Sequence, residues 1–279
     1  MASLANLDIK LGSLSIEKDP TRYGYIETVD FLFEQPLSDE PETDDEFDTV
    51  TIPNRRVHYR HDALITSGFR VTGYSDLSNS GNHATQATLA QQGLLVPVPG
   101  NNKLFGPYFT GLTWYRSAAS AIPAAGITVS FWSAAYFEDA TSAVGVGNVA
   151  DAIDGGFAMI QNATPNKIAQ YKTGVTQSES STNIPESGMH WWLSVFRFYN
   201  GSVTNSLLWI DGIAQTISVP NAIVLYPSNP SASRFLIGTV FPVTLGMKGI
   251  ILDIGLCDGS LQSQVSQMNN FMRKRYGTP

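Results

Sequence analysis

Carboxylate side chains are the first residues of this sequence that could do chemistry, since paired carboxylates cleave glycosidic bonds. After residue 60 the chain contains only three glutamates, Glu138, Glu179 and Glu186. Glu138 stands beside Asp139, so on an extended strand the two side chains would point to opposite faces. Glu179 and Glu186 lie in a stretch rich in serine and threonine. No expected strand carries two acids at spacing i+2 or i+4, so the sequence predicts a protein that is not an enzyme.

Histidine, cysteine and glycine patterns also fail to complete a reactive site or a cofactor site. No third ligand with metal-binding spacing accompanies the histidines. Each of the four is therefore predicted to be solvent-exposed or to cap a turn: His58, His61, His83 and His190. The single cysteine, Cys257, excludes an intramolecular disulfide and is predicted to be a small buried residue. Residues 145–150 have the GxGxxA form, but glycines follow too soon for a helix, so a loop is predicted.

Aromatic side chains are the remaining candidates, because an exposed ring can stack on a sugar. Four of them lie near the predicted ends of strands: Trp114, Tyr115, Tyr136 and Phe137. Most aromatic residues of a β-sandwich belong to its core. Two alternatives, glycan stacking and core packing, therefore stay open at these four positions.

The charge of the chain is concentrated at one end. Residues 1–60 contain 13 acidic and 6 basic side chains, whereas residues 61–279 contain 11 of each. The neutral second part lacks the basic footprint of a nucleic-acid-binding protein, and no apolar run reaches the ~20 residues that span a bilayer. Neither a nucleic-acid partner nor membrane insertion is predicted. The first residues also lack the basic and apolar regions of a secretory signal.

Residues 1–60 are predicted to form an arm that packs on a partner, since their short alternating runs, 8–16 and 25–33, close no core of their own. The acidic segment 39–48 is typical of a solvated loop, and contact with a basic partner surface is the alternative. The residues predicted to contact the partner are Tyr23, Tyr25, Phe31, Phe33, Asp44, Asp45 and Glu46.

The pattern changes from residue 61 onward to about ten short strands separated by turns, which is typical of an antiparallel sandwich. The strongest pair, 190–199 and 207–215, carries large apolar side chains on both faces, with Trp191 on one side and Trp192 on the other. Such a hairpin belongs inside a two-layer structure. Asp211-Gly212 predicts a tight turn after its second strand.

One helix is predicted, at the end of the chain. Four apolar residues recur there at the spacing of a single helical face: Leu261, Val265, Met268 and Met272. Ser260 is the predicted N-cap, and Gly277 is predicted to end the helix.

Several segments together resemble the concanavalin A-like, laminin G-like jelly-roll family. The loop 76–86 (DLSNSGNHATQ) is similar to the family's D-x-S-G-N-G-N-x-A-T segment, although Asn79-Ser80 stand where Gly-Asn is common. Residues 127–132 (ITVSFW) resemble one family strand, and Trp191 with 208–212 (LWIDG) resembles the family's W…DG hairpin. Residues 235–238, 249–256 and the helix ending at Gly277 are similar to its closing elements. The resemblance covers about residues 61–277.

This resemblance implies an all-β fold: a two-sheet antiparallel jelly-roll sandwich with a short C-terminal helix and, before residue 61, an extended N-terminal arm. Some family members hold calcium at the rim of the sandwich, but no ligand set matches here residue by residue. No cofactor is therefore predicted, and a rim calcium is left as an open alternative. Domains of this kind with an N-terminal arm are similar to those of tailed-phage virion proteins.

The leading functional prediction is a non-enzymatic virion structural protein, of the capsid decoration or head or tail fibre/spike type. Its residues 1–60 would anchor it to other virion proteins, and it would form a homo-oligomer during assembly in the host cytoplasm. The alternative is a carbohydrate-binding adhesin or receptor-binding module that contacts a host cell-surface glycan. A glycan-cleaving enzyme is the third and last alternative.

Overall fold

The computed structural model describes residues 52, 54–118, 127–138, 144–148, 158–162, 167–172, 175–179, 188–197, 207–216, 234–240 and 245–279. All of them belong to one compact unit, residues 43–279. Residues 1–51 of the predicted arm, with all seven predicted partner-contact positions, lie outside the described residues.

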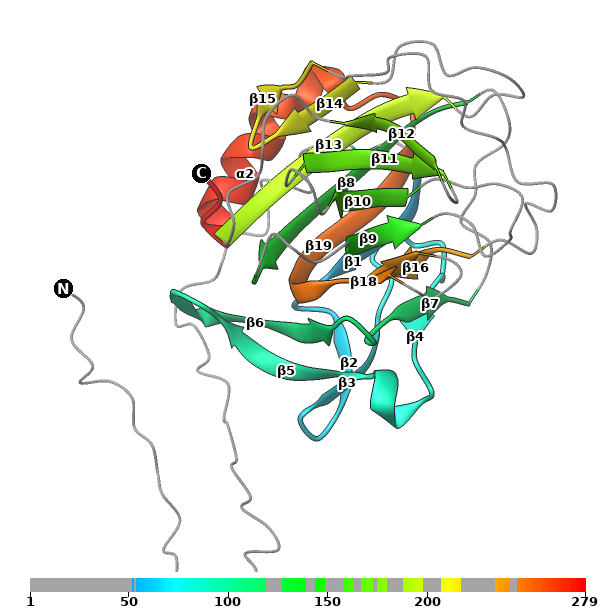
Figure 1. Ribbon diagram of the computed structural model, residues 1–279, viewed down its shortest axis with the longest axis vertical. Coiled ribbons are helices and arrows are strands. Elements are labelled where there is room, and N and C mark those ends of the chain that lie inside the picture. The colour runs from blue at the N-terminus through cyan, green and yellow to red at the C-terminus, as the bar shows by residue number, and fades with distance from the viewer. Residues whose placement is uncertain are drawn as a thin grey trace, which may run out of the picture. The chain divides into compact units, whose positions relative to one another are not determined.

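Strands make up most of the described chain (Figure 1). In order they are β1 (Arg55–Arg60), β2 (Leu64–Ser67), β3 (Arg70–Tyr74), β4 (Ala84–Thr85), β5 (Gly93–Val98), β6 (Asn101–Thr110), β7 (Tyr115–Ser117), β8 (Thr128–Phe137), β9 (Val144–Asn148), β10 (Ala158–Asn162), β11 (Lys167–Lys172), β12 (Val175–Glu179), β13 (Gly188–Arg197), β14 (Leu207–Ile210), β15 (Ile213–Ala214), β16 (Leu236–Ile237), β17 (Thr239–Val240), β18 (Leu245–Gly246) and β19 (Lys248–Asp258). The helical elements are η2 (Leu89–Gln91), η3 (Gln262–Gln264) and α2 (Val265–Tyr276).

The first layer is an antiparallel sheet built from the longest apolar segments. β8 lies between β13 and β19 and pairs with both along its length. β14 extends the sheet beyond β13, while β1 and the end of β6 pair with successive parts of β19. The sequence of β8, TVSFWSAAYF, is rich in the β-branched and aromatic residues that favour a strand buried on both faces.

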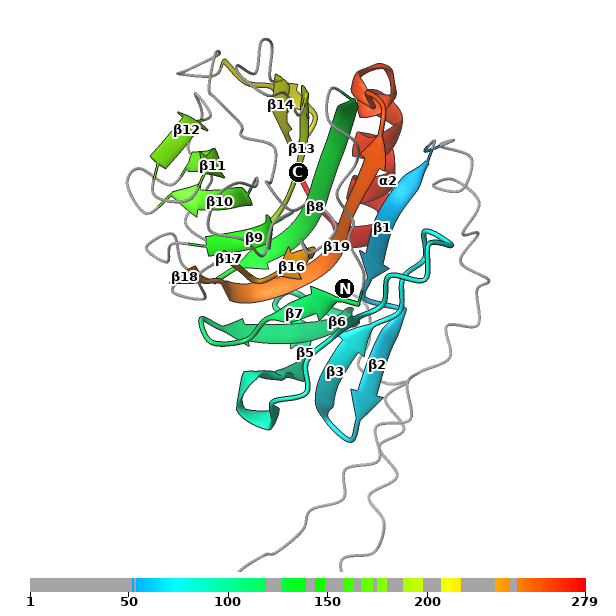
Figure 2. The ribbon, with the colours of Figure 1, turned by 90° about the vertical axis from the view of Figure 1, so that its right-hand side faces the viewer.

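The second layer continues from shorter strands. β9, β10, β11 and β12 pair consecutively, and β16 connects β9 to β7. β7 pairs in turn with β4, and β4 with β3. In Figure 2, β9–β12 lie on one side of the β8–β19 sheet and α2 lies on the other. The predicted all-β antiparallel sandwich with a short C-terminal helix is confirmed.

Two apolar clusters occupy the two faces of the first layer. The cluster between the layers contains Phe131, Phe137 and Trp192, whereas the cluster beneath α2 contains Trp132 and Trp191. All five side chains are fully buried. Neighbouring residues of β8 and β13 therefore point to opposite faces, as the strand geometry requires. The interpretation of the tryptophan-rich hairpin as core is confirmed.

The predicted turn at Asp211-Gly212 is also confirmed. It joins β14 to β15 with two residues, whose φ angles are 50° and 78°. Positive φ at both central positions is the geometry of the hairpin turns that match strand twist, and Gly212 adopts it without strain.

The helix ends where the sequence predicts but begins later. Gly277 adopts the left-handed conformation, and its N–H donates to the carbonyl of Arg273 at 3.0 Å. At the other end, Gln264 and not Ser260 is the N-cap. The hydroxyl of Ser260 accepts a 3.3 Å hydrogen bond from the N–H of Gln262, at the start of the preceding turn η3.

The predicted loop at 145–150 is wrong. Residues 144–148 form β9, which pairs with β10 and β16. Glycines have a low preference for strands. Here β9 is stabilised because it pairs with β10 on one edge and β16 on the other, and such context outweighs local preference.

The predicted boundary at residue 60 falls too late in the chain. Residues 55–60 form β1, which pairs with β19 from Arg55 opposite Cys257 to Arg60 opposite Asp253. The side chains of Val57 and Tyr59 are fully buried in the core between the layers. β1 is therefore part of the body and not of the arm.

The prediction that Cys257 is a buried residue is confirmed, because its side chain lies in the cluster beneath α2. Burial raises the pKa of the thiol to about 12. We therefore expect the native protein to resist an aromatic disulfide reagent at about pH 8, since only the thiolate attacks it. The absorbance of the released thiol should rise only after denaturation. Rapid labelling of the native protein would contradict this expectation.

Within the described residues, no helix has the length and hydropathy that a membrane span requires.

Candidate functional site

Two of the four aromatic residues predicted for glycan stacking are fully buried. Tyr115 lies between the layers, where its hydroxyl donates to the carbonyl of Val71 at 3.0 Å. Phe137 stacks on Trp192 at 5.6 Å between ring centroids. Strand alternation directs both rings inward, so neither can contact a sugar, and the stacking prediction is wrong at these positions.

The other two aromatic residues are partly exposed but lie in different places. Trp114 precedes β7 in the second layer and sits beside η2, where its backbone N–H donates to the carbonyl of Gln91 at 3.3 Å. Tyr136 lies in β8 and packs on the cluster at the outer face of the first layer. The structure therefore does not assemble the four predicted residues into one site.

Tyr136 belongs instead to a group that the sequence did not reveal, which we call the tyrosine–glutamate cluster: Tyr108, Tyr136 and Glu138. Ile250 of β19 pairs with Tyr108 of β6 on one side and with Tyr136 on the other. Both tyrosines pack against the outer apolar cluster to which Ile250 belongs. Glu138 is exposed, and it follows Tyr136 by two positions at the end of β8, which places both on the same face.

A hydrogen bond from the hydroxyl of Tyr108 to Glu138 Oε2 closes the cluster. Tyr108 lies in β6 and Glu138 directly follows β8, and β19 lies between these two strands. The outer face therefore presents two tyrosines and one accessible carboxylate side by side, a combination suited to holding a sugar by stacking and by hydroxyl hydrogen bonds.

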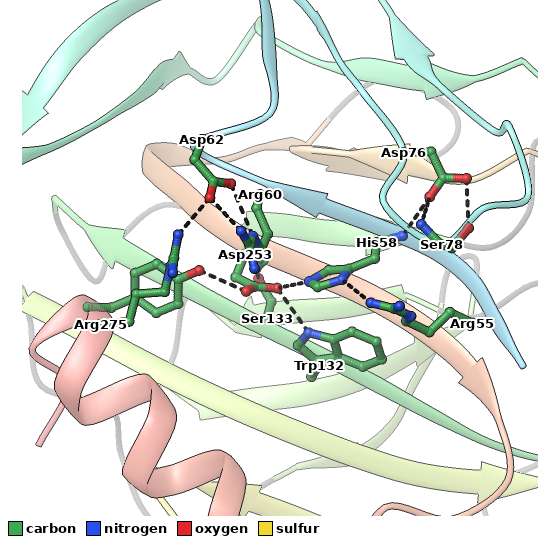
Figure 3. Close-up of polar contacts among 11 residues, drawn as sticks. Arg55, His58, Arg60, Asp62, Asp76, Ser78, Trp132, Ser133, Asp253 and Arg275 are labelled. Atoms are coloured by element: carbon green, nitrogen blue, oxygen red, sulfur yellow. Dashed lines mark hydrogen bonds and ion pairs between the residues drawn. The ribbon is translucent and has the colours of Figure 1, made fainter. Parts of the chain in front are cut away.

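A second polar group is centred on Asp253 of β19, whose side chain is fully buried (Figure 3). Its Oδ1 lies 3.1 Å from Nε2 of His58 and accepts from Nε1 of Trp132 at 3.0 Å. Its Oδ2 accepts from the hydroxyl of Tyr276 at 2.8 Å. The network thus joins β1, β8, β19 and the last turn of α2, and it stabilises their packing.

The Asp253 carboxylate remains ionised despite its burial. Burial alone would raise its pKa, but the charge and hydrogen bond of His58 and the hydrogen bond of Tyr276 hold it below its usual range, with Arg60 adding to the effect. A carboxylate that is buried and already hydrogen-bonded on both oxygens has no room for a substrate. We therefore assign this network to the fold and not to catalysis.

The prediction of exposed or capping histidines fails at three positions, since His61 is only partly exposed and its Nδ1 is buried without a hydrogen-bond partner among the described residues. His58 is 1% exposed in the network just described, and His190 is 3% exposed. Nδ1 of His190 lies 2.7 Å from Oδ2 of Asp211, in the turn after β14. His83 fits the prediction, since it is exposed and accepts from the N–H of Asp76 at 3.0 Å.

The loop that carries the family-like segment 76–86 has a structural role. Asp76 accepts from the N–H groups of His58, Ser78 and Asn82 at 2.9–3.0 Å and from the Ser78 hydroxyl at 2.7 Å. The side-chain amide of Asn82 donates to the carbonyl of Arg56, and the hydroxyl oxygen of Ser78 lies 3.3 Å from the same carbonyl. The loop therefore covers the edge of β1, and both oxygens of Asp76 are engaged there. Across the described part, including this loop, no group of three or more His, Cys, Asp or Glu side chains could hold a metal ion.

Comparison with protein-family models finds no match, and comparison with curated proteins finds none either. Among solved structures, the chain is similar to domain 4 of AbnA, a GH43 extracellular arabinanase from Geobacillus stearothermophilus, in complex with arabinotriose. The two are 15% identical with a TM-score of 0.51, over 78% of this chain and 98% of that chain. The chain is a β-sandwich.

Two further structures have the same fold. One is an arabinofuranosidase complexed with arabinofuranosyl-α-1,2-xylobiose, 12% identical with a TM-score of 0.50, over 81% of this chain and 64% of that chain. The other is a sialidase of Trypanosoma rangeli, 10% identical with a TM-score of 0.50, over 80% of this chain and 33% of that chain. At these identities the likeness shows the fold alone, and the sandwich spans only part of either enzyme.

Proposed function

We propose that this chain is a non-catalytic carbohydrate-binding module and that the tyrosine–glutamate cluster holds the sugar. The observation that carries the proposal is the hydrogen bond from Tyr108 to the exposed carboxylate of Glu138 across the outer face, beside Tyr136. Aromatic rings pack against the C–H faces of sugar rings, and a carboxylate accepts hydrogen bonds from their hydroxyls.

The structural neighbours support the ligand class by analogy. The arabinanase domain was solved with arabinotriose, and the arabinofuranosidase with a substituted xylobiose. The first of these is a domain of about the same extent as the present chain. Fold does not determine function, so the argument rests mainly on the cluster itself.

The carboxylates within the described part favour binding over hydrolysis. Glycoside hydrolysis uses two carboxyl groups on opposite sides of the scissile bond. Glu138 is accessible at the cluster, whereas Asp253 is buried and Asp62 and Asp258 form ion pairs with arginines. We therefore expect sugars to be held and not cleaved.

Replacing Tyr136 with alanine should weaken binding to a saccharide by about tenfold, because it removes one stacking surface. Retention on immobilised neutral polysaccharides, followed by calorimetry with the soluble oligosaccharide, measures this change. Trp114→Ala is the matched control, since Trp114 is the other partly exposed aromatic residue of the predicted set and lies in the second layer. Circular dichroism should show that both variants fold.

Three outcomes would oppose the proposal in different ways. Binding lost in Trp114→Ala and kept in Tyr136→Ala would place the site elsewhere while preserving the function. No retention on any of a broad set of glycans would contradict the function. Release of reducing sugar that disappears in Glu138→Gln would contradict the non-catalytic assignment.

The virion role, the homo-oligomer and the relationship to phage laminin G-like domains stay predictions from the sequence. They depend mainly on the arm, which lies outside the described residues up to residue 51. A virion module could also bind a host glycan, so the two proposals are compatible.

A further inference from the structure

His61 occupies an unusual position between β1 and the end of α2. Its ring meets the ring of Tyr276 edge-on, with centroids 5.6 Å apart and planes at 78°. Its backbone is fixed by a 2.8 Å hydrogen bond from its N–H to the carbonyl of Leu252. Its Nδ1 is buried and has no hydrogen-bond partner among the described residues. The site therefore holds the ring by packing and not by hydrogen bonding.

Two positively charged groups, Arg60 and Arg275, already lie near the ring, and the surrounding charges do not favour a protonated His61 as well. Asp62 already accepts from two guanidinium groups, from Arg60 Nε at 3.0 Å and from Arg275 Nη2 at 2.6 Å. Asp253 is engaged by the network of β1, β8 and α2 described above. The groups facing His61 are thus Arg60 from β1, Asp62 from the turn, Asp253 from β19, and Arg275 and Tyr276 from α2. An imidazolium here would place an N–H donor at Nδ1 with no acceptor, which is costly.

We propose that His61 makes the attachment of the C-terminal helix sensitive to acid: protonation drives the ring away from Tyr276 and loosens the last turn of α2. The inference does not depend on sugar binding.

The direction of the pH effect follows from the ring's surroundings. Burial lowers the pKa of His61 from 6.5; Asp62 and Asp253 oppose this shift, and Arg275 and Arg60 add to it. The packed ring therefore takes up a proton less readily than the released ring does. Attachment of α2 is strongest above the ordinary pKa of histidine. It weakens as the pH falls from there toward the lowered pKa of His61.

Cys257 provides an internal reporter of this loosening. It is the only cysteine of the chain, and it is buried in the apolar cluster to which α2 contributes Met268, Phe271 and Met272. Loosening of α2 should therefore open access to the thiol. Dithiodipyridine, an aromatic disulfide that reacts with thiols under acidic conditions, can report this access.

The experiment measures the labelling rate of Cys257 in the full-length protein between about pH 7.5 and about pH 5. Each rate is divided by that of the denatured protein at the same pH. We expect the normalised rate to rise severalfold toward the acidic end, because the released ring takes up a proton more readily than the packed ring. His61→Phe keeps an aromatic ring against Tyr276 and cannot be protonated, so its rate should stay flat. His83→Gln, which alters an exposed histidine in another loop, should keep the wild-type rise.

A flat wild-type profile would overturn the proposal, and so would an equal rise in His61→Phe. If the phenylalanine variant does not fold, His61→Gln replaces it in the same assay. NMR titration of the His61 ring in the wild-type protein gives an independent readout. A ring that titrates at the ordinary value, with the helix signals unchanged, would also overturn the proposal.

Discussion

Replacing Asp253 with alanine is expected to lower the free energy of unfolding by about 3–5 kcal/mol, because each buried donor left without its acceptor costs about 1–3 kcal/mol. The variant leaves the donors of His58, Trp132 and Tyr276 without their shared acceptor in a fully buried place. Urea unfolding followed by tryptophan fluorescence measures the loss.

Asp258 in the same strand provides the matched control for this experiment. It accepts two hydrogen bonds from Arg56, at 2.9 and 2.7 Å, but the arginine side chain is 36% exposed. Partly exposed ion pairs contribute about 1 kcal/mol or less, so Asp258→Ala should change stability little. Equal losses in the two variants would show that burial of the Asp253 network is not what stabilises the fold.

The same carboxylate should leave a signature in the pH dependence of stability. Because the pKa of Asp253 is lower in the folded protein than in the unfolded chain, its contribution is fully present above the ordinary carboxyl range. The contribution disappears as the pH falls through the lowered folded pKa. The stability curve of Asp253→Ala should therefore be flatter than that of the wild type at acidic pH.

Removal of residues 1–60, the whole predicted arm, is expected to prevent folding. The deletion takes away β1 with the buried side chains of Val57 and Tyr59, and burying such groups stabilises a protein by about 1.5–3 kcal/mol each. It also removes His58 from buried Asp253 and leaves the edge of β19 unpaired. Together these losses approach the whole stability of a typical domain, about 5–15 kcal/mol.

Removal of residues 1–50 is the control, because it takes away none of the contacts between described residues. This shorter protein should remain soluble and unfold cooperatively in circular dichroism. A folded protein lacking residues 1–60 would contradict the role assigned to β1. The shorter deletion also tests the assembly prediction: if the arm anchors the protein, incorporation into particles should be lost while the body stays folded.

The fold could be predicted largely from local alternation. Trp191 and Trp192 are neighbours in β13, and their placement on opposite faces follows from strand geometry alone. β1 could not be recognised in this way, because His58 and Arg60 alternate with its apolar residues and resemble a solvated edge. His58 is buried because it contacts Asp253, which is 195 residues away along the sequence, and Arg60 is paired with Asp62 in the following turn.

The candidate site was predictable only in part, for a similar reason. Tyr136 was among the expected glycan-stacking residues, but Tyr115 and Phe137 have the same local character and point inward. Tyr108 and Glu138 meet only because β19 aligns β6 with β8. The signal for Glu138 was its place two residues after Tyr136. Its partner Tyr108 lies 30 residues away along the sequence, and only the pairing of the strands brings the two side chains together.

The loop around Asp76 has a consequence for how copies of this protein can associate. The backbone groups of β1 that would otherwise face solvent are hydrogen-bonded to this loop, including the carbonyls of Arg55, Arg56 and His58. A strand from another molecule would have to break these bonds before it could add to the sheet there. The β1 edge is therefore closed to strand exchange and to fibril-like stacking, and any ordered assembly must be built through side-chain surfaces or another edge.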